Sequence, residues 1–347
     1  DVERTLHVIR ECAFVVSPYP IILSLENHCS AEQQAVLAEQ FVRVLGPLLL
    51  PPFPPDLAVL PSPDALRFRI LLKGSDKTCP EPSLNRLLHL RGAKYSGGPI
   101  PPHRPPYHMT SLSEIEVAKV NVMELAGYND HYLSRTYPAG VRVGSSNYSP
   151  VRVWNAGCQM VALNFQCPGP YTHCNTARFW ENGNSGYILR TPFAPPVPPL
   201  ALDVTVFSAR QLPKPEIFET LNTITIEKVS KMSRIAYNHA NKLVQKHVKC
   251  KETTSVVNPF VTITTTGFEE DCYQVKTAVV QSNGLTPEWH ESFKFHFNRP
   301  YAAMMTLQVN HKEKSSVPLC HYCIPVHCIR AGYRTLPLYN EGNVIIP

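Results

Sequence analysis

Apolar residues alternate between helical and strand-like spacing over the first part of the chain. A first helix is predicted from residues at helical intervals, namely Val2, Leu6, Ile9 and Ala13. Prolines at positions 18 and 20 end it before a buried-strand pattern, IILSL. Ser30 and Gln33 have the spacing of a capping box ahead of a second helix. With the apolar run at 68–72, this alternation is typical of a parallel α/β layer.

The middle of the chain is less regular. Residues 75–106 are rich in proline, glycine and basic side chains, and we interpret them as a linker. Ser111 and Glu114 form a second capping-box pattern, which predicts a helix beginning at Ser111. Two apolar runs of strand length follow, QMVALNF and GYILR. The proline cluster at 194–199 then indicates a domain boundary.

Beyond that cluster, strict alternation of apolar and polar residues takes over. It begins with LDVTVF and continues in FVTITTTG, YQVKTAVV, ESFKFHF and MMTLQVN, with a turn at Asn283-Gly284. The pattern predicts an antiparallel β-sandwich. A basic, helix-like segment interrupts it from about residue 216 to 251.

Composition narrows the class of protein. The 347 residues can form two domains, and a hydrophobic content of 44% suits a globular chain. A net charge of +6 is too mild for a nucleic-acid binder but suits contact with an anionic membrane surface. Eleven dispersed cysteines favour a reducing cytosol over a disulfide framework. No apolar run reaches the roughly 18 residues of a membrane span. We therefore expect a cytoplasmic protein that is peripheral at membranes.

Several ordered segments carry a resemblance to a known family. YPIILSLENHCSAEQQ, LPSPDALRFRILLKG, the stretch 133–169 and NGNSGYILR are similar to the X and Y catalytic regions of eukaryotic phosphoinositide-specific phospholipase C. LDVTVFSARQLPKP and NGLTPEWHESFKF resemble the C2 domain of that family. The resemblance implies an α/β part followed by an all-β part: a partial TIM-like (β/α) barrel lacking its first strands, then an antiparallel C2 β-sandwich.

The same resemblance implies a division of the chain. Residues 1–74 correspond to the C-terminal part of the X region, 75–106 to the X/Y linker and 107–193 to the Y region. Residues 200–347 correspond to the C2 domain, with a basic helical insertion near 216–251.

The reaction that the resemblance implies is hydrolysis of phosphatidylinositol 4,5-bisphosphate to inositol trisphosphate and diacylglycerol. The family uses two histidines and a calcium ion, and in the family pattern both histidine segments lie upstream of Asp1. No catalytic residue is therefore assigned in this chain. Of the calcium ligands only Glu26 is matched, and calcium requires about six to eight oxygens. We expect the chain to be inactive by itself.

Residues that contact the inositol phosphates are better represented. By motif match these are Lys73, Ser111, Arg135 and Tyr137. Arginine offers bidentate phosphate contacts, lysine a point charge and tyrosine a ring face for the inositol. Where the family usually has a second lysine, this chain has Ser75. Without the resemblance, Ser111 is interpreted as a helix cap, and the charged residues as solvated surface groups or locally paired carboxylates.

Two segments of the C-terminal half bear on metal binding, a cluster of cysteines and histidine and the positions of C2 calcium ligands. Cys320 and Cys323 have zinc-like spacing with His327 and Cys328 nearby, but strand alternation would turn half of these side chains away from a common centre, so a zinc site is disfavoured. Cys158 and Cys167 flank a predicted strand and are interpreted as packed thiols. Asparagine or lysine stands near the positions where calcium-binding C2 domains carry acids, namely Asn258, Asn310 and Lys312. A calcium-independent C2 domain is expected.

The basic segment has two interpretations. Its cations are Lys228, Lys231, Arg234, Lys242, Lys246, Lys249 and Lys251, with no acidic residue among them. It is either a solvated helix on the sandwich or a helix that lies on anionic lipid.

Three hypotheses follow for the whole chain. The first is a fragment of an active phosphoinositide phospholipase C, a monomer acting on phosphoinositide lipids under upstream regulators. The second is a catalytically dead phosphoinositide-binding scaffold. The third is a C2 interaction module with a vestigial catalytic half.

Overall fold

A computed structural model describes residues 1–95, 97, 104–190, 198–214, 216–218, 250–252, 256–313 and 316–346. The helices are α1 Val2–Cys12, α2 Ala31–Gln40, α3 Pro82–Arg86, α4 Glu114–Lys119, α5 Val122–Asn129, α6 Pro150–Asn155 and α7 Pro170–Trp180. Short helical turns are η1 Phe41–Leu45, η2 Gly46–Leu48, η3 Glu269–Asp271, η4 Pro300–Ala302 and η5 Val326–Cys328. Among the helices of these ranges, none has the length and apolar character that crossing a bilayer requires.

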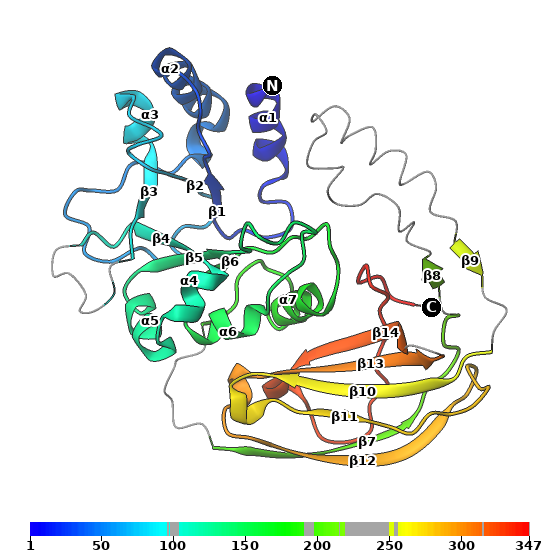
Figure 1. Ribbon diagram of the computed structural model, residues 1–347. Coiled ribbons are helices and arrows are strands. Elements are labelled where there is room, and N and C mark those ends of the chain that lie inside the picture. Colours follow the sequence, from blue (N-terminus) through cyan, green and yellow to red (C-terminus); the bar gives the residue numbers. More distant parts are fainter. Residues whose placement is uncertain are drawn as a thin grey trace.

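A parallel sheet of six strands organises the first half of the chain (Figure 1). Its strands are β1 Ile21–Ser24, β2 Ile70–Gly74, β3 Leu88–Ala93, β4 His108–Ser113, β5 Leu133–Tyr137 and β6 Met160–Val161. They pair in sequence order, and no ladder between described residues joins β6 back to β1. The sheet is therefore an open half-barrel, as the sequence predicted.

The helices cover the outer face of this sheet. On β2, Ile70 and Leu72 belong to one buried cluster with α1, α2 and η1, while Leu71 and Lys73 point to the opposite face. A second cluster joins Leu112 of β4 to α4, α5 and α6. Because strand side chains alternate, this apolar packing fixes which residues face the concave interior.

The two predicted N-terminal helices are confirmed. α1 begins at Val2, and its N-cap is Asp1, whose carboxylate accepts a hydrogen bond from the amide of Glu3 at 3.1 Å. α2 begins after Ser30, whose side chain and that of Gln33 form both hydrogen bonds of a capping box. Each cap satisfies amides that the first turn of its helix leaves without a partner.

The second predicted capping box is wrong by two residues. Ser111 lies on β4, and the helix cap is Ser113, which pairs reciprocally with Glu116. Both serines have an acidic residue three positions on, so spacing alone does not distinguish them.

Residues 75–106 contain more regular structure than the linker interpretation implied. α3 and β3 lie within them, and β3 pairs with β2 on one side and β4 on the other. The strand contributes Leu88, His89 and Leu90 to the buried interior. Conversely, GYILR (186–190) forms no strand, and QMVALNF contributes only the short β6. These short runs carry too few residues for periodicity to be decisive.

The second half is the antiparallel sandwich that the alternation predicted. One sheet has the order β11-β10-β13-β14 and the other pairs β12 with β7. The strands are β7 Leu200–Ser208, β10 Pro259–Thr266, β11 Gln274–Lys276, β12 Glu288–Phe297, β13 Met304–Lys312 and β14 Ser316–Pro325. Ile263, Phe297 and Met305 lie at the centre of a continuous core between the sheets.

The predicted basic insertion lies mostly outside the described residues. At its two ends, β8 Glu216–Phe218 pairs antiparallel with β9 Cys250–Glu252. The last two residues predicted as helix, 250 and 251, are thus in a strand, and residues 228–249 are outside the described part of the chain.

The half-barrel packs against the sandwich through α7 and β14 (Figure 1). Val151, Cys174 and Ala177 form a small buried cluster with Met304 and Cys323 of the sandwich. Beside this cluster two buried rings from opposite sides, His173 and His321, stack with centroids 3.5 Å apart. The two halves therefore share a core.

Candidate functional site

Two basic side chains converge at the carboxyl end of the half-barrel. Lys73 extends from the end of β2 and Arg135 from the middle of β5, both on the concave face. They line a cavity of about 310 Å³ together with Ser24 at the end of β1. The ladder places Ser24 directly beside Lys73. The carboxyl ends of barrel strands are where active sites of such folds lie.

The electrostatics of this cavity favour an anion. Partial burial, followed by repulsion from Arg135, lowers the pKa of Lys73. Among the described residues, those that line the cavity include no carboxylate and no histidine. A phosphate bound between the two cations would stabilise the charged form of Lys73. Its negative charge would offset both the loss of solvent and the repulsion from Arg135.

The other two predicted substrate contacts stand next to Arg135. The guanidinium carbon of Arg135 lies 5.3 Å from the ring centroid of Tyr137, so the ring holds the cation by a cation–π contact. Ser111 pairs with Arg135 across the β4–β5 ladder and is exposed. Lys73, Ser111, Arg135 and Tyr137 are thus on neighbouring positions of one face, although only Lys73 and Arg135 line the cavity itself.

Glu26, the predicted calcium ligand, stands apart. Its side chain is 93% exposed, and its carboxylate lies 3.7 Å from the ring of His28. Among the described residues, it belongs to no group of potential metal-binding side chains. A single exposed carboxylate does not fit calcium, which needs several converging oxygens. Ser75, at the position of the second family lysine, bonds instead to Thr78, with the two hydroxyl oxygens 3.0 Å apart.

Asp1 caps the first helix, α1. In the family pattern, the two histidine segments precede this position. The exposed carboxylate of Asp1 caps α1 through the amide of Glu3, and Asp1 lines neither of the two cavities on the concave face of the sheet. The sequence assigned no catalytic role to Asp1, and its place at the start of α1 gives no reason to add one.

The loop that follows β5 is held by an ion pair that sequence reasoning missed. Arg142 donates to both carboxylate oxygens of Glu114, at the start of α4, and to the carbonyl of Asn147. The Arg142 hydrogen bond is the main reason that the pKa of Glu114 is lowered. Glu114 also accepts from the amide of Ala139. The pair therefore fixes the chain leading away from Arg135 and Tyr137.

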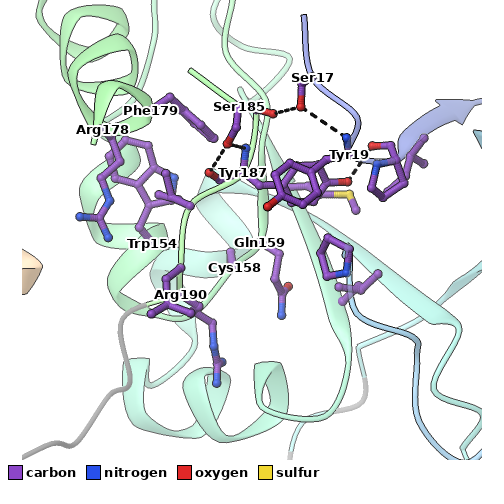
Figure 2. Close-up of a pocket in the computed structure, with 18 of the residues that line it drawn as sticks. Ser17, Tyr19, Trp154, Cys158, Gln159, Arg178, Phe179, Ser185, Tyr187 and Arg190 are labelled. Atoms are coloured by element: carbon purple, nitrogen blue, oxygen red, sulfur yellow. Dashed lines mark hydrogen bonds between the residues drawn. The ribbon is translucent and has the colours of Figure 1, made fainter. Parts of the chain in front are cut away.

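A larger cavity, of about 780 Å³, opens on the same concave face toward the amino ends of the strands. Figure 2 shows its rim, where the Tyr19 and Tyr187 rings meet with centroids 5.4 Å apart. Its floor is apolar and includes Leu71, Leu90 and Leu133. Burial raises the pKa of Cys158, another lining residue, to about 12, so this thiol stays protonated. This agrees with the interpretation of Cys158 as a packed thiol.

Cys320 and Cys323, the two cysteines with zinc-like spacing, do not converge. Cys320 belongs to the core of the sandwich, whereas Cys323 faces α7 with its sulfur 3.7 Å from that of Cys174. The two side chains point to different surroundings, as strand alternation led us to expect.

The described chain is therefore an open parallel half-barrel, with two cations lining one cavity on its concave face, followed by an antiparallel β-sandwich. Three family descriptions match: the phosphatidylinositol-specific phospholipase C X domain at residues 1–76, its Y domain at 84–193, and the C2 domain at 200–336. The chain belongs to the phosphatidylinositol-specific phospholipase C family.

Curated relatives agree with this assignment. The chain is 32% identical to 1-phosphatidylinositol 4,5-bisphosphate phosphodiesterase delta-3-A of Danio rerio, over 99% of this chain and 48% of the relative. It is 32% identical to the delta-1 enzyme of Rattus norvegicus, over 97% of this chain and 49% of the relative. It is also 30% identical to human inactive phospholipase C-like protein 1, over 96% of this chain and 33% of the relative.

A solved structure shows the same architecture. The crystal structure of S. officinalis PLC21 superimposes with a TM-score of 0.76 at 26% identity, covering 98% of this chain and 45% of that one. The chain spans about half the length of the phosphodiesterase relatives it matches.

Proposed function

We propose that this chain serves a phosphoinositide phospholipase C that hydrolyses phosphatidylinositol 4,5-bisphosphate to inositol trisphosphate and diacylglycerol. Its described residues would supply the recognition of the phosphorylated head group. The observation that carries the proposal is the convergence of Lys73 and Arg135 on one cavity at the carboxyl end of the sheet. The substrate is proposed from the relatives, two of which are named for this lipid.

Each proposed contact has a distinct chemical part. Arg135 would bind a phosphate through two parallel hydrogen bonds, and Lys73 would add a point charge. The contact between Arg135 and the Tyr137 ring limits the orientations of the guanidinium before a ligand arrives. Ser111, exposed beside Arg135, would donate its hydroxyl to a neighbouring phosphate or inositol oxygen.

We also propose that this chain by itself does not turn over the lipid. Cleavage requires a general base and a general acid, and the described residues that line the cationic cavity contain neither histidine nor carboxylate. Calcium is the proposed cofactor of the family reaction. Glu26 alone does not fit the ion, so the proposed recognition of the head group does not depend on calcium.

The surroundings of the reaction are proposed from the same family. The protein would meet its substrate as a cytoplasmic monomer, peripheral at an anionic membrane, with upstream regulators. The net charge of +6 supports attraction to such a surface.

A catalytically inactive phosphoinositide-binding scaffold is the second candidate. One observation favours it: a relative named inactive phospholipase C-like protein 1 is 30% identical over 96% of this chain. The scaffold shares the head-group site with the enzyme and differs in lacking turnover.

Binding of inositol trisphosphate to the full chain, measured by calorimetry, tests the head-group site. Lys73→Met and Arg135→Gln should each weaken binding at least about tenfold, because each removes a charge-assisted contact worth about 1.5–3 kcal/mol. Lys294→Met is the matched control, since Lys294 is exposed on β12 of the sandwich. Equal affinities of all variants would contradict the proposed site.

Turnover is tested separately with labelled phosphatidylinositol 4,5-bisphosphate in mixed micelles containing calcium. The purified chain should release no inositol trisphosphate above background. Release that is abolished by Lys73→Met would contradict the proposed inactivity while supporting the site.

A further inference from the structure

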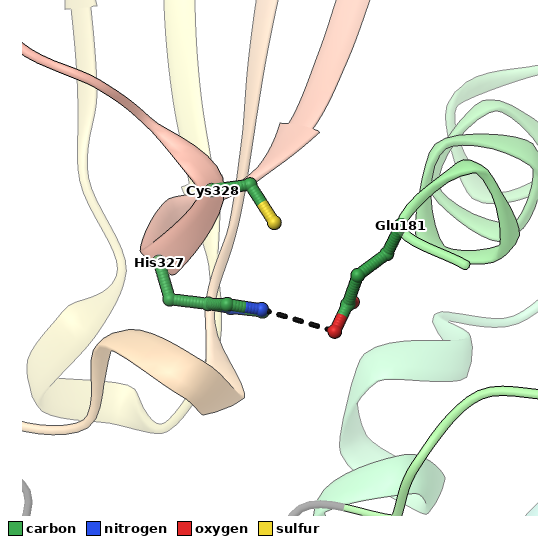
Figure 3. A group of neighbouring side chains, drawn as sticks. All are labelled: Glu181, His327 and Cys328. Carbon is green, nitrogen blue, oxygen red and sulfur yellow. Dashed lines mark hydrogen bonds and ion pairs between the residues drawn. The ribbon is translucent and has the colours of Figure 1, made fainter. Parts of the chain in front are cut away.

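A carboxylate, an imidazole and a thiol meet at the junction of the half-barrel and the sandwich. They belong to Glu181, His327 and Cys328, and their ligand atoms all lie within 4.8 Å of one another (Figure 3). Within the described part of the chain, this is the only group of such side chains that could hold a metal ion. We propose that these three residues form a zinc site that clasps the two halves of the molecule together.

The polypeptide brings the ligands from two separate elements. Glu181 follows α7 directly, as its C-terminal capping residue, and His327 and Cys328 lie in η5, the turn that follows β14. The packing of α7 on β14 fixes these elements relative to each other. The site is therefore built on the rigid interface and not on a free loop.

The spacing of the donor atoms is close to that of a tetrahedral zinc centre. The carboxylate oxygen of Glu181 lies 3.1 Å from Nε2 of His327. Ordinary zinc–ligand bonds of about 2.0–2.3 Å place tetrahedral donors about 3.3–3.6 Å apart. The Cys328 sulfur lies within 4.8 Å of both other donors, so it needs to approach them by at most roughly 1 Å. A small rotation of one side chain would complete the three-ligand set.

Contacts around Glu181 and His327 hold these two side chains in position. Arg178 binds the other carboxylate oxygen of Glu181 at 2.8 Å, which leaves the first oxygen directed at His327. The His327 ring stacks on Tyr301, with centroids 4.5 Å apart and planes 20° apart. Side chains of Glu181 and His327 are only 24% and 13% exposed. Such outer contacts orient metal ligands and restrict their motion before the ion binds.

The donor set indicates which ion would bind. Thiolate and imidazole are ligands of zinc and similar transition metals, whereas calcium and magnesium take oxygen donors. Binding would replace the thiol proton of Cys328 with the metal and release that proton to solvent. Because the thiol must lose its proton to bind the metal, zinc affinity should increase with pH. A water molecule would take the fourth position.

Metal content and thermal stability of the full chain test the site. The purified protein is stripped with a chelator, dialysed against zinc and analysed for bound metal by mass spectrometry. One tightly bound zinc per chain is expected, together with a rise in Tm, because the ion binds the folded site. Cys328→Ser and Glu181→Gln should each weaken binding at least about tenfold. They should also lose most of the zinc-dependent rise in Tm.

Cys272→Ser is the matched control, because Cys272 is an exposed free cysteine of the sandwich that belongs to no group of potential metal ligands among the described residues. It should bind zinc as the wild-type chain does. Cobalt gives a spectroscopic readout: a sulfur-to-cobalt charge-transfer band should appear in the wild type and the control and be absent in Cys328→Ser. Comparison of Tm values without metal shows whether each variant is folded.

Two outcomes would overturn the proposal. One is a folded wild-type chain that takes up no zinc at micromolar concentration. The other is zinc binding that Cys328→Ser and Glu181→Gln leave unchanged. In either case the contact is a hydrogen-bonded histidine–glutamate pair between the two halves and nothing more.

Discussion

Acidification should destabilise this protein through the histidine pair stacked between α7 and β14. His173 and His321 are each about 4% exposed, and their rings are nearly parallel, with a 10° angle between them. Burial, reinforced by the neighbouring His173, lowers the pKa of His321 to about 4 from an ordinary value of 6.5. Burial is also the main cause that lowers the pKa of His173. The folded protein thus holds both rings neutral.

The direction of the effect follows from proton binding. Below about pH 6.5 the unfolded chain takes up a proton at position 321, while the folded chain does not until pH 4 is approached. The unfolding free energy linked to His321 is therefore highest above pH 6.5 and falls as the pH decreases from 6.5 to 4. The full difference between the two pKa values corresponds to roughly 3 kcal/mol of unfolding free energy from His321.

Urea unfolding at several pH values between about 7.5 and 4.5 measures this loss. His321→Gln keeps a hydrogen-bonding group near Asn343, which His321 contacts at 3.2 Å, but removes the titration. Its stability should depend less steeply on pH than that of the wild type, whereas His296→Gln, at an exposed position of β12, should leave the slope unchanged. Parallel slopes for wild type and His321→Gln would refute the reasoning.

Three further predictions concern other parts of the fold. Arg142→Gln breaks the partly buried pair with Glu114, so the free energy of unfolding, measured by thermal unfolding, should fall by about 2 kcal/mol. Adding Glu114→Gln to the same chain should restore most of that free energy. Asn129→Ala removes the partner of two buried hydrogen bonds, so the free energy of unfolding in urea should fall by about 2 kcal/mol. An unchanged urea midpoint would show that these two hydrogen bonds do not stabilise the fold. Vesicle sedimentation of the full chain should not respond to micromolar calcium, because the amide of Asn310 is buried and already bonds within the sandwich. Clear recruitment by calcium would exclude a calcium-independent C2 domain.

Sequence reasoning succeeded where a pattern was long or was part of a matched motif. Alternation in the C-terminal half located β10, β12 and β13, because period-two burial over many residues has few competing explanations. The predicted cations Lys73 and Arg135 do line one cavity, because both side chains extend from neighbouring parts of the parallel sheet to its concave face. Their role in binding a head group stays a prediction.

The failures came from features that depend on tertiary structure. β3 is stabilised by its two flanking strands, and its six residues are too few to stand out in a basic, proline-rich stretch. The cap at Ser113 was misplaced because Ser111 offers the same spacing two residues earlier. The junction of Glu181 with His327 joins residues 146 positions apart, which no local pattern can reveal.

The shared core of α7 and β14 also changes what a domain boundary means in this chain. A proline-rich stretch separates the two halves in the sequence, but Cys174 and Cys323 lie in one buried cluster with residues of both halves. A proteolytic cut within residues 191–197 should therefore leave two pieces that elute together from a sizing column and melt in a single transition. The packed interface, and not the covalent connection, would then hold the two halves together. The sandwich would keep one fixed orientation relative to the half-barrel.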